Sequence, residues 1–336
     1  MFRLLTPSRL ASTPSRISKL FYSTKMSFTP SSILIFGATG NIGQHITSAI
    51  VGAQPKFDKV TIFTSQNTVD NKQDLLKSWS GINVVAGDIS QGKDVSAALQ
   101  GVDTVVSCVG RGALNAQTDL IQIAEAAGVK WFFPSEYGTD IEYGPASATE
   151  KPHQMKLAVR NYVRENVKSM KVTYLVTGPY IDFYFTMHPS VPQAGGWNVK
   201  AKESVLLGDG NGKVGFCSMR DVGRFLAASL RHPEASFGKA LKVQSFVCTP
   251  KEIQAEFEKQ TGGGWDVRFT PFDELKTLES RAWTEGSPVS TIFTLRRIWT
   301  EGGTLYEKND NETVGMGPGS TDTLEWAVGQ AVANAK

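Results

Sequence analysis

The feature that most constrains this chain is a regular alternation of short apolar runs with amphipathic segments, which begins at Ser31. The apolar runs are rich in β-branched residues and predict strands, whereas the segments between them repeat their apolar residues at helical spacing. Such alternation is typical of a parallel sheet that is covered by helices on both faces. Because five alternations precede Tyr137, we predict an α/β fold with a doubly wound parallel sheet.

The expected elements follow one another as far as Gly178, beyond which the pattern loosens. Strands are predicted at residues 31–36, 59–63, 83–88, 103–110, 129–136 and 171–178. Helices are predicted at residues 41–51, 74–80, 93–100, 115–127, 153–165 and 221–230. We therefore expect one domain over residues 27–178, and a smaller, irregular α/β lobe that binds the substrate over residues 179–336. Some segments of this lobe are expected to return to the first domain.

A glycine-rich turn, GATGNIG, joins the first predicted strand to the first predicted helix. Its spacing allows a tight turn, and the start of the helix offers free N–H groups and a positive dipole end to a pyrophosphate. The alternative is that the glycines only let the helix pack on the strand. We predict a Rossmann dinucleotide-binding domain whose pyrophosphate contacts come from Gly37, Thr39, Gly40, Asn41, Ile42 and Gly43.

The residues after the second strand indicate which dinucleotide is bound. Enzymes that prefer NAD usually carry Asp or Glu there to bind the ribose hydroxyls, but residues 64–67 read TSQN and contain no carboxylate. We predict NADP(H), with Ser65 and Lys72 at the 2′-phosphate, although Lys72 can equally be a solvated lysine. Asp88, which follows the third strand, is a candidate adenine contact.

Composition excludes several classes of protein. The chain has 40% hydrophobic and 20% charged residues, as in ordinary globular proteins. No run approaches the roughly 18 apolar residues of a membrane span, and Cys108, Cys217 and Cys248 are too scattered for a disulfide framework or a metal site. We predict a reducing compartment, no metal, no membrane span and a small-molecule partner.

The N-terminal segment, residues 1–26, has the composition of a mitochondrial presequence. It combines five basic residues with Ser, Thr and apolar residues, and the chain contains no Asp or Glu before Asp58. The alternatives are a disordered basic leader or a cytoplasmic protein that starts at Met26. Removing five positive charges from the net charge of +3 leaves about −2, so the basic pI does not indicate nucleic-acid binding.

The catalytic pattern of ordinary short-chain dehydrogenases is absent, because no Tyr in the sequence has Lys four residues later. The chain instead contains WFFPSEYG at residues 131–138 and HQMKLAVRNYV at residues 153–163. Together with GDGN at residues 208–211, these segments resemble the NmrA-like, isoflavone-reductase-like branch of the short-chain dehydrogenases. That branch includes the isoflavone, pinoresinol and phenylcoumaran benzylic ether reductases. The resemblance covers residues 33–230, and it departs at Ser65, where plant members usually carry Arg.

The resemblance implies that Lys156 is the catalytic lysine and that Ser107 and Val109 line the nicotinamide side. An ammonium near the nicotinamide can bind the ribose or polarise a substrate, and a desolvated amine can move a proton. Arg160, one helical turn later, would favour the neutral amine. The alternative for Lys156 is an exposed lysine on a helix. His153 lies three residues before Lys156, and the alternative to a substrate-lining role for it is a surface or capping residue.

An aromatic segment follows the last clear strand and is suited to a flat, apolar substrate. The candidate substrate-lining residues are His153, Tyr180, Phe183, Tyr184 and His188. Ordinary core packing is the alternative for this cluster, and Cys108 is expected to be a buried packing residue.

The sequence therefore predicts an NADPH-dependent oxidoreductase that reduces a small aromatic or conjugated substrate, with Lys156 assisting at oxygen. The alternative is a dinucleotide-binding redox sensor that resembles the NmrA regulators, which lack the lysine. An epimerase-like extended dehydrogenase is disfavoured because the Tyr and Lys pair is missing.

Overall fold

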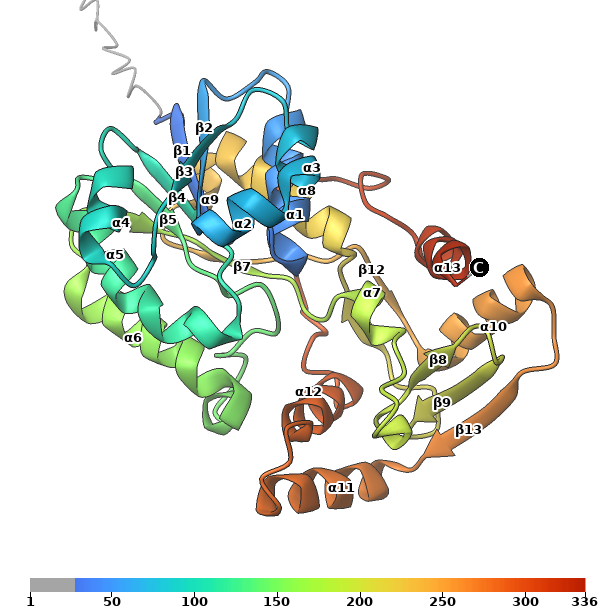
Figure 1. Cartoon of the computed structure of the whole chain (residues 1–336). Helices are drawn as coiled ribbons and strands as arrows, with labels where there is room; N and C mark the ends of the chain where they lie inside the picture. Colours follow the sequence, from blue (N-terminus) through green and yellow to red (C-terminus); the bar gives the residue numbers. More distant parts are fainter. Residues whose placement is uncertain (1–27, 336) are drawn as a thin grey trace, which may run out of the picture.

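The computed structural model describes residues 28–335, which form a parallel sheet domain and a second lobe joined at one edge (Figure 1). The predicted presequence at residues 1–26 lies outside the described residues and stays a prediction. Within the described part, no helix is both long and apolar enough to cross a membrane.

The first domain is built on a six-stranded parallel sheet in the order β3-β2-β1-β4-β5-β6. Its strands are β1 (Ser32–Phe36), β2 (Lys59–Thr64), β3 (Asn83–Ala86), β4 (Thr104–Ser107), β5 (Trp131–Phe133) and β6 (Lys171–Val172). The order reverses between β1 and β4, as it does in Rossmann folds. This confirms the predicted fold class.

Helices cover both faces of this sheet (Figure 1). They are α1 (Asn41–Gly52), α2 (Gln66–Asn71), α3 (Gln73–Ser78), α4 (Gly92–Ala98), α5 (Gln117–Ala126), α6 (Gln154–Asn166), α8 (Met219–Arg231) and α9 (Pro233–Ser236). In β1, Ile33 and Ile35 pack on the side of α1 and α8, and Leu34 and Phe36 pack on the side of α4, α5 and α6. All four side chains are fully buried, which explains why this strand is a continuous apolar run.

The second lobe contains a three-stranded sheet in the order β13-β9-β8 and a two-stranded antiparallel sheet of β10 and β12. Its strands are β8 (Gly196–Asn198), β9 (Glu203–Leu207), β10 (Val214–Phe216), β12 (Phe246–Cys248) and β13 (Asp266–Thr270). Its helices are α7 (Ile181–Tyr184), α10 (Pro250–Thr261), α11 (Phe272–Thr284), α12 (Ser290–Thr300) and α13 (Leu324–Asn334). The helix α8 and its successor α9 pack against the first domain.

Two elements differ from the prediction. The helix α2 was not predicted, because its sequence QNTVDN buries no residue and therefore shows no apolar period. The single strand expected at residues 171–178 divides at Thr173: β6 pairs with β5, whereas β7 (Tyr174–Val176) pairs with β11 (Ala240–Lys242). A change of pairing partner within one apolar run leaves no signal in the sequence.

The contact between α1 and α8 requires glycine. A Cβ atom on Gly223 of α8 would lie 2.3 Å from the carbonyl oxygen of His45 in α1, a backbone atom that cannot move aside cheaply. A Cβ atom on Gly52, at the end of α1, would have no heavy atom within 4 Å. The two helices therefore approach each other closely only because Gly223 has no side chain.

We expect Gly223→Ala to lower the free energy of unfolding by about 1 to 3 kcal/mol, since the added methyl group overpacks this contact. Gly52→Ala is the matched control and should leave stability unchanged or slightly higher, because alanine favours the helix. Urea denaturation at unchanged m-value measures both effects. Equal stability of the two variants would contradict the close approach.

Candidate active site

The glycine-rich turn after β1 brings bare backbone to the start of α1. Gly37 has a φ of 70°, and a Cβ atom on it would lie 2.5 Å from the carbonyl oxygen of Cys108. A Cβ atom on Gly43 would lie 2.1 Å from the carbonyl oxygen of Gly37. Gly40 precedes α1 without a side-chain cap, so the first N–H groups of the helix remain available. This arrangement fits a pyrophosphate, with Thr39, Asn41 and Ile42 in the same turn.

Lys72 extends back to this turn. Its Nζ donates a hydrogen bond of 2.9 Å to the carbonyl oxygen of Thr39, so the ammonium lies beside the phosphate-binding backbone. Ser65 stands at the start of α2, where its Oγ accepts a hydrogen bond from the backbone N–H of Thr68 at 3.2 Å. The structure thus gives Lys72 a defined position, unlike that of a freely solvated lysine.

Asp88 lies exposed after β3. Its carboxylate accepts hydrogen bonds from the backbone N–H and the Oγ of Ser90, at 2.9 and 2.8 Å, and the backbone bond in particular lowers the pKa of Asp88. The carboxylate is therefore ionised and oriented at neutral pH.

The end of β4 holds the two residues expected at the nicotinamide. Ser107 is fully buried, and within the described residues its Oγ has no hydrogen-bond partner. The carbonyl oxygen of Val109 accepts a hydrogen bond of 2.8 Å from the Oγ of Ser135, which connects the ends of β4 and β5. Cys108 lies between Ser107 and Val109 in the sequence. Burial raises the pKa of its thiol to about 12, so the thiol is no nucleophile at neutral pH.

Lys156 projects from α6 toward the segment that follows β5. Its Nζ donates a hydrogen bond of 2.5 Å to the carbonyl oxygen of Glu136. Burial, more than any neighbouring charge, lowers the pKa of Lys156 to about 8; Arg111 and then Arg160 act in the same direction, and Glu136 opposes them. The sequence pointed to Arg160 for this effect, but burial and Arg111 contribute more.

Glu136 and Arg160 form a buried ion pair beneath Lys156. The two guanidinium nitrogens Nε and Nη2 of Arg160 both donate to the carboxylate of Glu136, and both side chains are at most 4% exposed. The third nitrogen, Nη1, donates to Glu142 at 2.6 Å. Burial raises the pKa of Glu136, and the guanidinium of Arg160 acts against this shift. The pair fixes the start of the PSEYG loop on α6.

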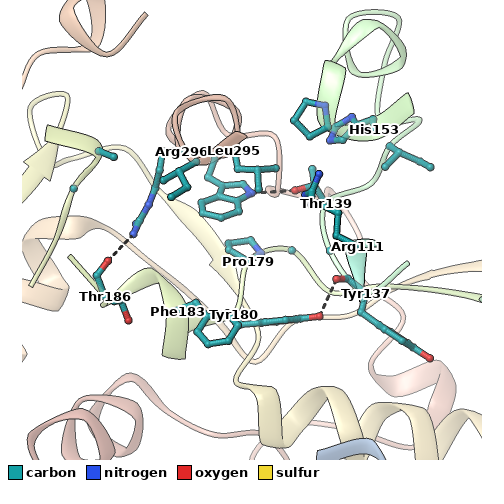
Figure 2. Close-up of a pocket in the computed structure, with 18 of the residues that line it drawn as sticks. Arg111, Tyr137, Thr139, His153, Pro179, Tyr180, Phe183, Thr186, Leu295 and Arg296 are labelled. Carbon is teal, nitrogen blue, oxygen red and sulfur yellow. Dashed lines mark hydrogen bonds between the residues drawn. The ribbon is translucent and has the colours of Figure 1, made fainter. Parts of the chain in front are cut away.

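A cavity of about 600 Å³ opens above Lys156, between the first domain and the second lobe. Its polar wall includes Tyr180, whose OH donates a hydrogen bond of 2.9 Å to the carbonyl oxygen of Tyr137, and Trp299, whose Nε1 donates one of 3.0 Å to Thr139 Oγ1 (Figure 2). The size suits a small organic ligand.

Four of the five residues predicted to line the substrate lie at this cavity: His153, Tyr180, Phe183 and His188. His153 is 3% exposed, its Nδ1 lies 2.8 Å from the carbonyl oxygen of Ser147, and burial lowers its pKa. It is therefore neither a surface residue nor a side-chain cap. Tyr184 is placed elsewhere, in the core of the second lobe, where its ring packs against Phe216 with centroids 4.8 Å apart.

The residues of the cavity that sequence reasoning did not find include Arg111, Arg296 and Trp299. Arg111 begins a short 3₁₀ segment directly after β4, and the rule that ligands bind beyond the carboxyl ends of parallel strands could have identified it. Arg296 and Trp299 lie on α12, in a region without an interpretable pattern, and no signal in the sequence indicates them.

No group of His, Cys, Asp or Glu side chains among residues 28–335 is arranged to hold a metal ion.

Comparison with known proteins identifies relatives over most of the chain. The model of the NmrA-like family matches residues 29–329. A phenylcoumaran benzylic ether reductase of Pinus taeda is 30% identical over 74% of this chain and 80% of its own length, and an isoflavone reductase of Pisum sativum is 29% identical over 76% and 84%. The solved structure of AtPrR2 with NADP⁺ and (+)-pinoresinol has a TM-score of 0.73 at 23% identity, covering 92% of this chain and all of that one.

We expect Arg160→Met to lower the free energy of unfolding by about 3 to 5 kcal/mol, because it leaves the buried carboxylate of Glu136 without its partner. Arg164→Met is the matched control, since Arg164 also contacts Glu142 but its side chain is 53% exposed; its effect should stay below about 1 kcal/mol. Urea unfolding measures both, and similar losses in the two variants would contradict the importance of the buried pair.

Proposed function

The chain belongs to the NmrA-like family, and on that premise we propose that it is an NADPH-dependent reductase of a small aromatic substrate. The observation that carries the proposal is the position of Lys156, which lines a cavity beyond the carboxyl ends of the parallel strands and has a pKa of about 8. Ligands of open α/β sheets bind at that edge.

The proposed cofactor is NADP(H). The glycine-rich turn and the uncapped start of α1 would hold the pyrophosphate, and Lys72 and Ser65 would hold the 2′-phosphate. Ser107 and Val109 would face the nicotinamide, and Asp88 the adenine. When bound, NADPH supplies the hydride. The presence of NADP⁺ in the AtPrR2 structure supports this choice.

The proposed substrate is aromatic. Tyr180, Phe183 and Trp299 line the cavity, and a flat ring can pack against such side chains with the favourable offset or edge-on geometries of aromatic pairs. The relatives that are named as reductases of phenylcoumaran benzylic ethers and isoflavones support this class of substrate.

Lys156 is proposed to donate a proton to the oxygen of the substrate. The lowered pKa makes its ammonium a stronger acid than an ordinary lysine, while the amine is still mostly protonated at pH 7. The hydrogen bond to the carbonyl oxygen of Glu136 holds the group in one place, and the two remaining N–H bonds are free for the substrate and the cofactor ribose.

The direct test is oxidation of NADPH by the purified protein in the presence of a phenylcoumaran or an isoflavone, followed by the absorbance of NADPH and by identification of the product. Turnover that depends on Lys156 supports the reductase. Tight binding of NADPH without oxidation against any aromatic ether, enone or quinone methide would instead favour a redox sensor of the NmrA regulator type.

We expect Lys72→Ala to reduce the ratio of NADPH to NADH affinity about tenfold or more, because one charge-assisted contact to the 2′-phosphate is lost. Lys77→Ala is the control, since Lys77 is exposed on the neighbouring helix α3. Fluorescence titration with both cofactors measures the ratio. An unchanged ratio in Lys72→Ala would remove Lys72 from the phosphate site.

We expect Lys156→Met to bind NADPH normally and to lose most of its turnover, typically 10²-fold or more for a missing general acid. In the native protein, kcat/KM should fall about tenfold per pH unit above about pH 8, because the ammonium then loses its proton. The pH profile should be flat in this range for the residual activity of Lys156→Met.

Lys151→Met is the control for this prediction. Lys151 is an exposed lysine five residues earlier that stacks on Trp283, and it does not line the cavity. Its variant should keep the native rate and pH profile. A native rate that rises above pH 8 would show that the neutral amine is the active form, which contradicts proton donation by Lys156.

A further inference from the structure

The charged side chains that line the cavity above Lys156 are all positive. Three cationic side chains line it, those of Arg111, Lys156 and Arg296, and no Asp or Glu does. Within residues 28–335, none of these three forms an ion pair. By contrast, the guanidinium of Arg297, next to Arg296 in the sequence, contacts the carboxylates of Glu150, Glu279 and Glu301. The charge of this neighbour is thus balanced, whereas the charge of the cavity is not.

Arg296 is the most unusual of the three. The residue is 5% exposed, and its Nη2 donates to the carbonyl oxygen of Tyr184 at 2.8 Å. Its Nη1 is buried and has no hydrogen-bond partner in the described part of the chain. The guanidinium stacks over the ring of Tyr184 at 4.1 Å, and Trp299 lies at 5.8 Å. A buried charged donor without an acceptor is costly, so an acceptor supplied by a ligand would recover that cost.

The position of Arg296 separates it from the cofactor site. The turn that would hold the pyrophosphate follows β1, and Arg111 follows β4, both in the first domain. Arg296 belongs to α12 of the second lobe, and in the view of Figure 2 it lies beside Thr186, across Pro179 from Arg111. Charge compensation for Arg296 must therefore come from the substrate side of the cavity.

We propose that the substrate of this cavity is an aromatic acid, whose carboxylate is bound by Arg296 while its ring packs against Tyr180, Phe183 and Trp299. A guanidinium presents several N–H donors in one plane, which suits a carboxylate better than a hydroxyl or ether oxygen. That the substrate is aromatic rests on the proposed function, and that it is an acid rests on the unpaired cations of the cavity.

The test compares two probes of nearly equal shape, cinnamate and cinnamamide, by calorimetric titration of the protein loaded with NADP⁺ at pH 7. Cinnamate should bind at least about tenfold more tightly than the neutral amide. Arg296→Gln should abolish this preference and leave the affinity for cinnamamide nearly unchanged. Arg281→Gln is the matched control, because the side chain of Arg281 is 70% exposed on α11, and it should keep the preference.

Equal affinity of the native protein for cinnamate and cinnamamide would overturn the proposal. This comparison needs no variant, so the proposal can be tested even if Arg296→Gln fails to fold. A preference for cinnamate that survives in a folded Arg296→Gln variant would also overturn it. The readout is binding, not turnover. A protein that prefers cinnamate but oxidises no NADPH would therefore contradict the proposed reductase while leaving the acid-binding site intact.

Discussion

The buried ion pair of Glu136 and Arg160 is the interaction on which the geometry of the site depends. It joins the segment after β5 to α6, two elements whose backbones do not pair with each other. Two charges removed from water are tolerated only when they satisfy one another, so this contact permits little variation in geometry. Lys156 stands one turn before Arg160 and donates to the carbonyl oxygen of the same Glu136. Glu136 thus fixes the position of α6 through both its carboxylate and its backbone carbonyl group.

The second constraint is the return of the chain to the first domain. After the aromatic segment, the chain re-enters the sheet domain as α8, which lies against α1 because Gly223 has no side chain. It leaves again through β12 and α10. The second lobe is therefore anchored at several places, and α12 is brought over the start of α6, where Arg297 pairs with Glu150. The cavity is formed by segments that lie more than a hundred residues apart in the sequence.

This construction explains what could and could not be predicted from the sequence. Strands such as β1 are continuous apolar runs, and helices such as α6 repeat their apolar residues at helical spacing, so their type and order were evident. The glycine turn was evident because its residues are adjacent in the chain. Tyr184 was misplaced because α7 is too short to display a period, and its helical rotation directs Tyr184 into the core while Phe183 stays 48% exposed. Arg296 contributes to the cavity only through the packing of α12, which no local pattern encodes.

Burial gives two of the three cationic groups of the cavity different roles. For Lys156, the loss of water lowers the pKa to about 8, which makes proton transfer accessible near neutral pH. For Arg296, burial also lowers the pKa, but a guanidinium starts so high that it stays charged. A buried charge that cannot be removed by deprotonation must be stabilised by a partner of opposite charge or by hydrogen-bond acceptors. The same burial therefore makes the lysine an acid of moderate strength and leaves the arginine permanently charged.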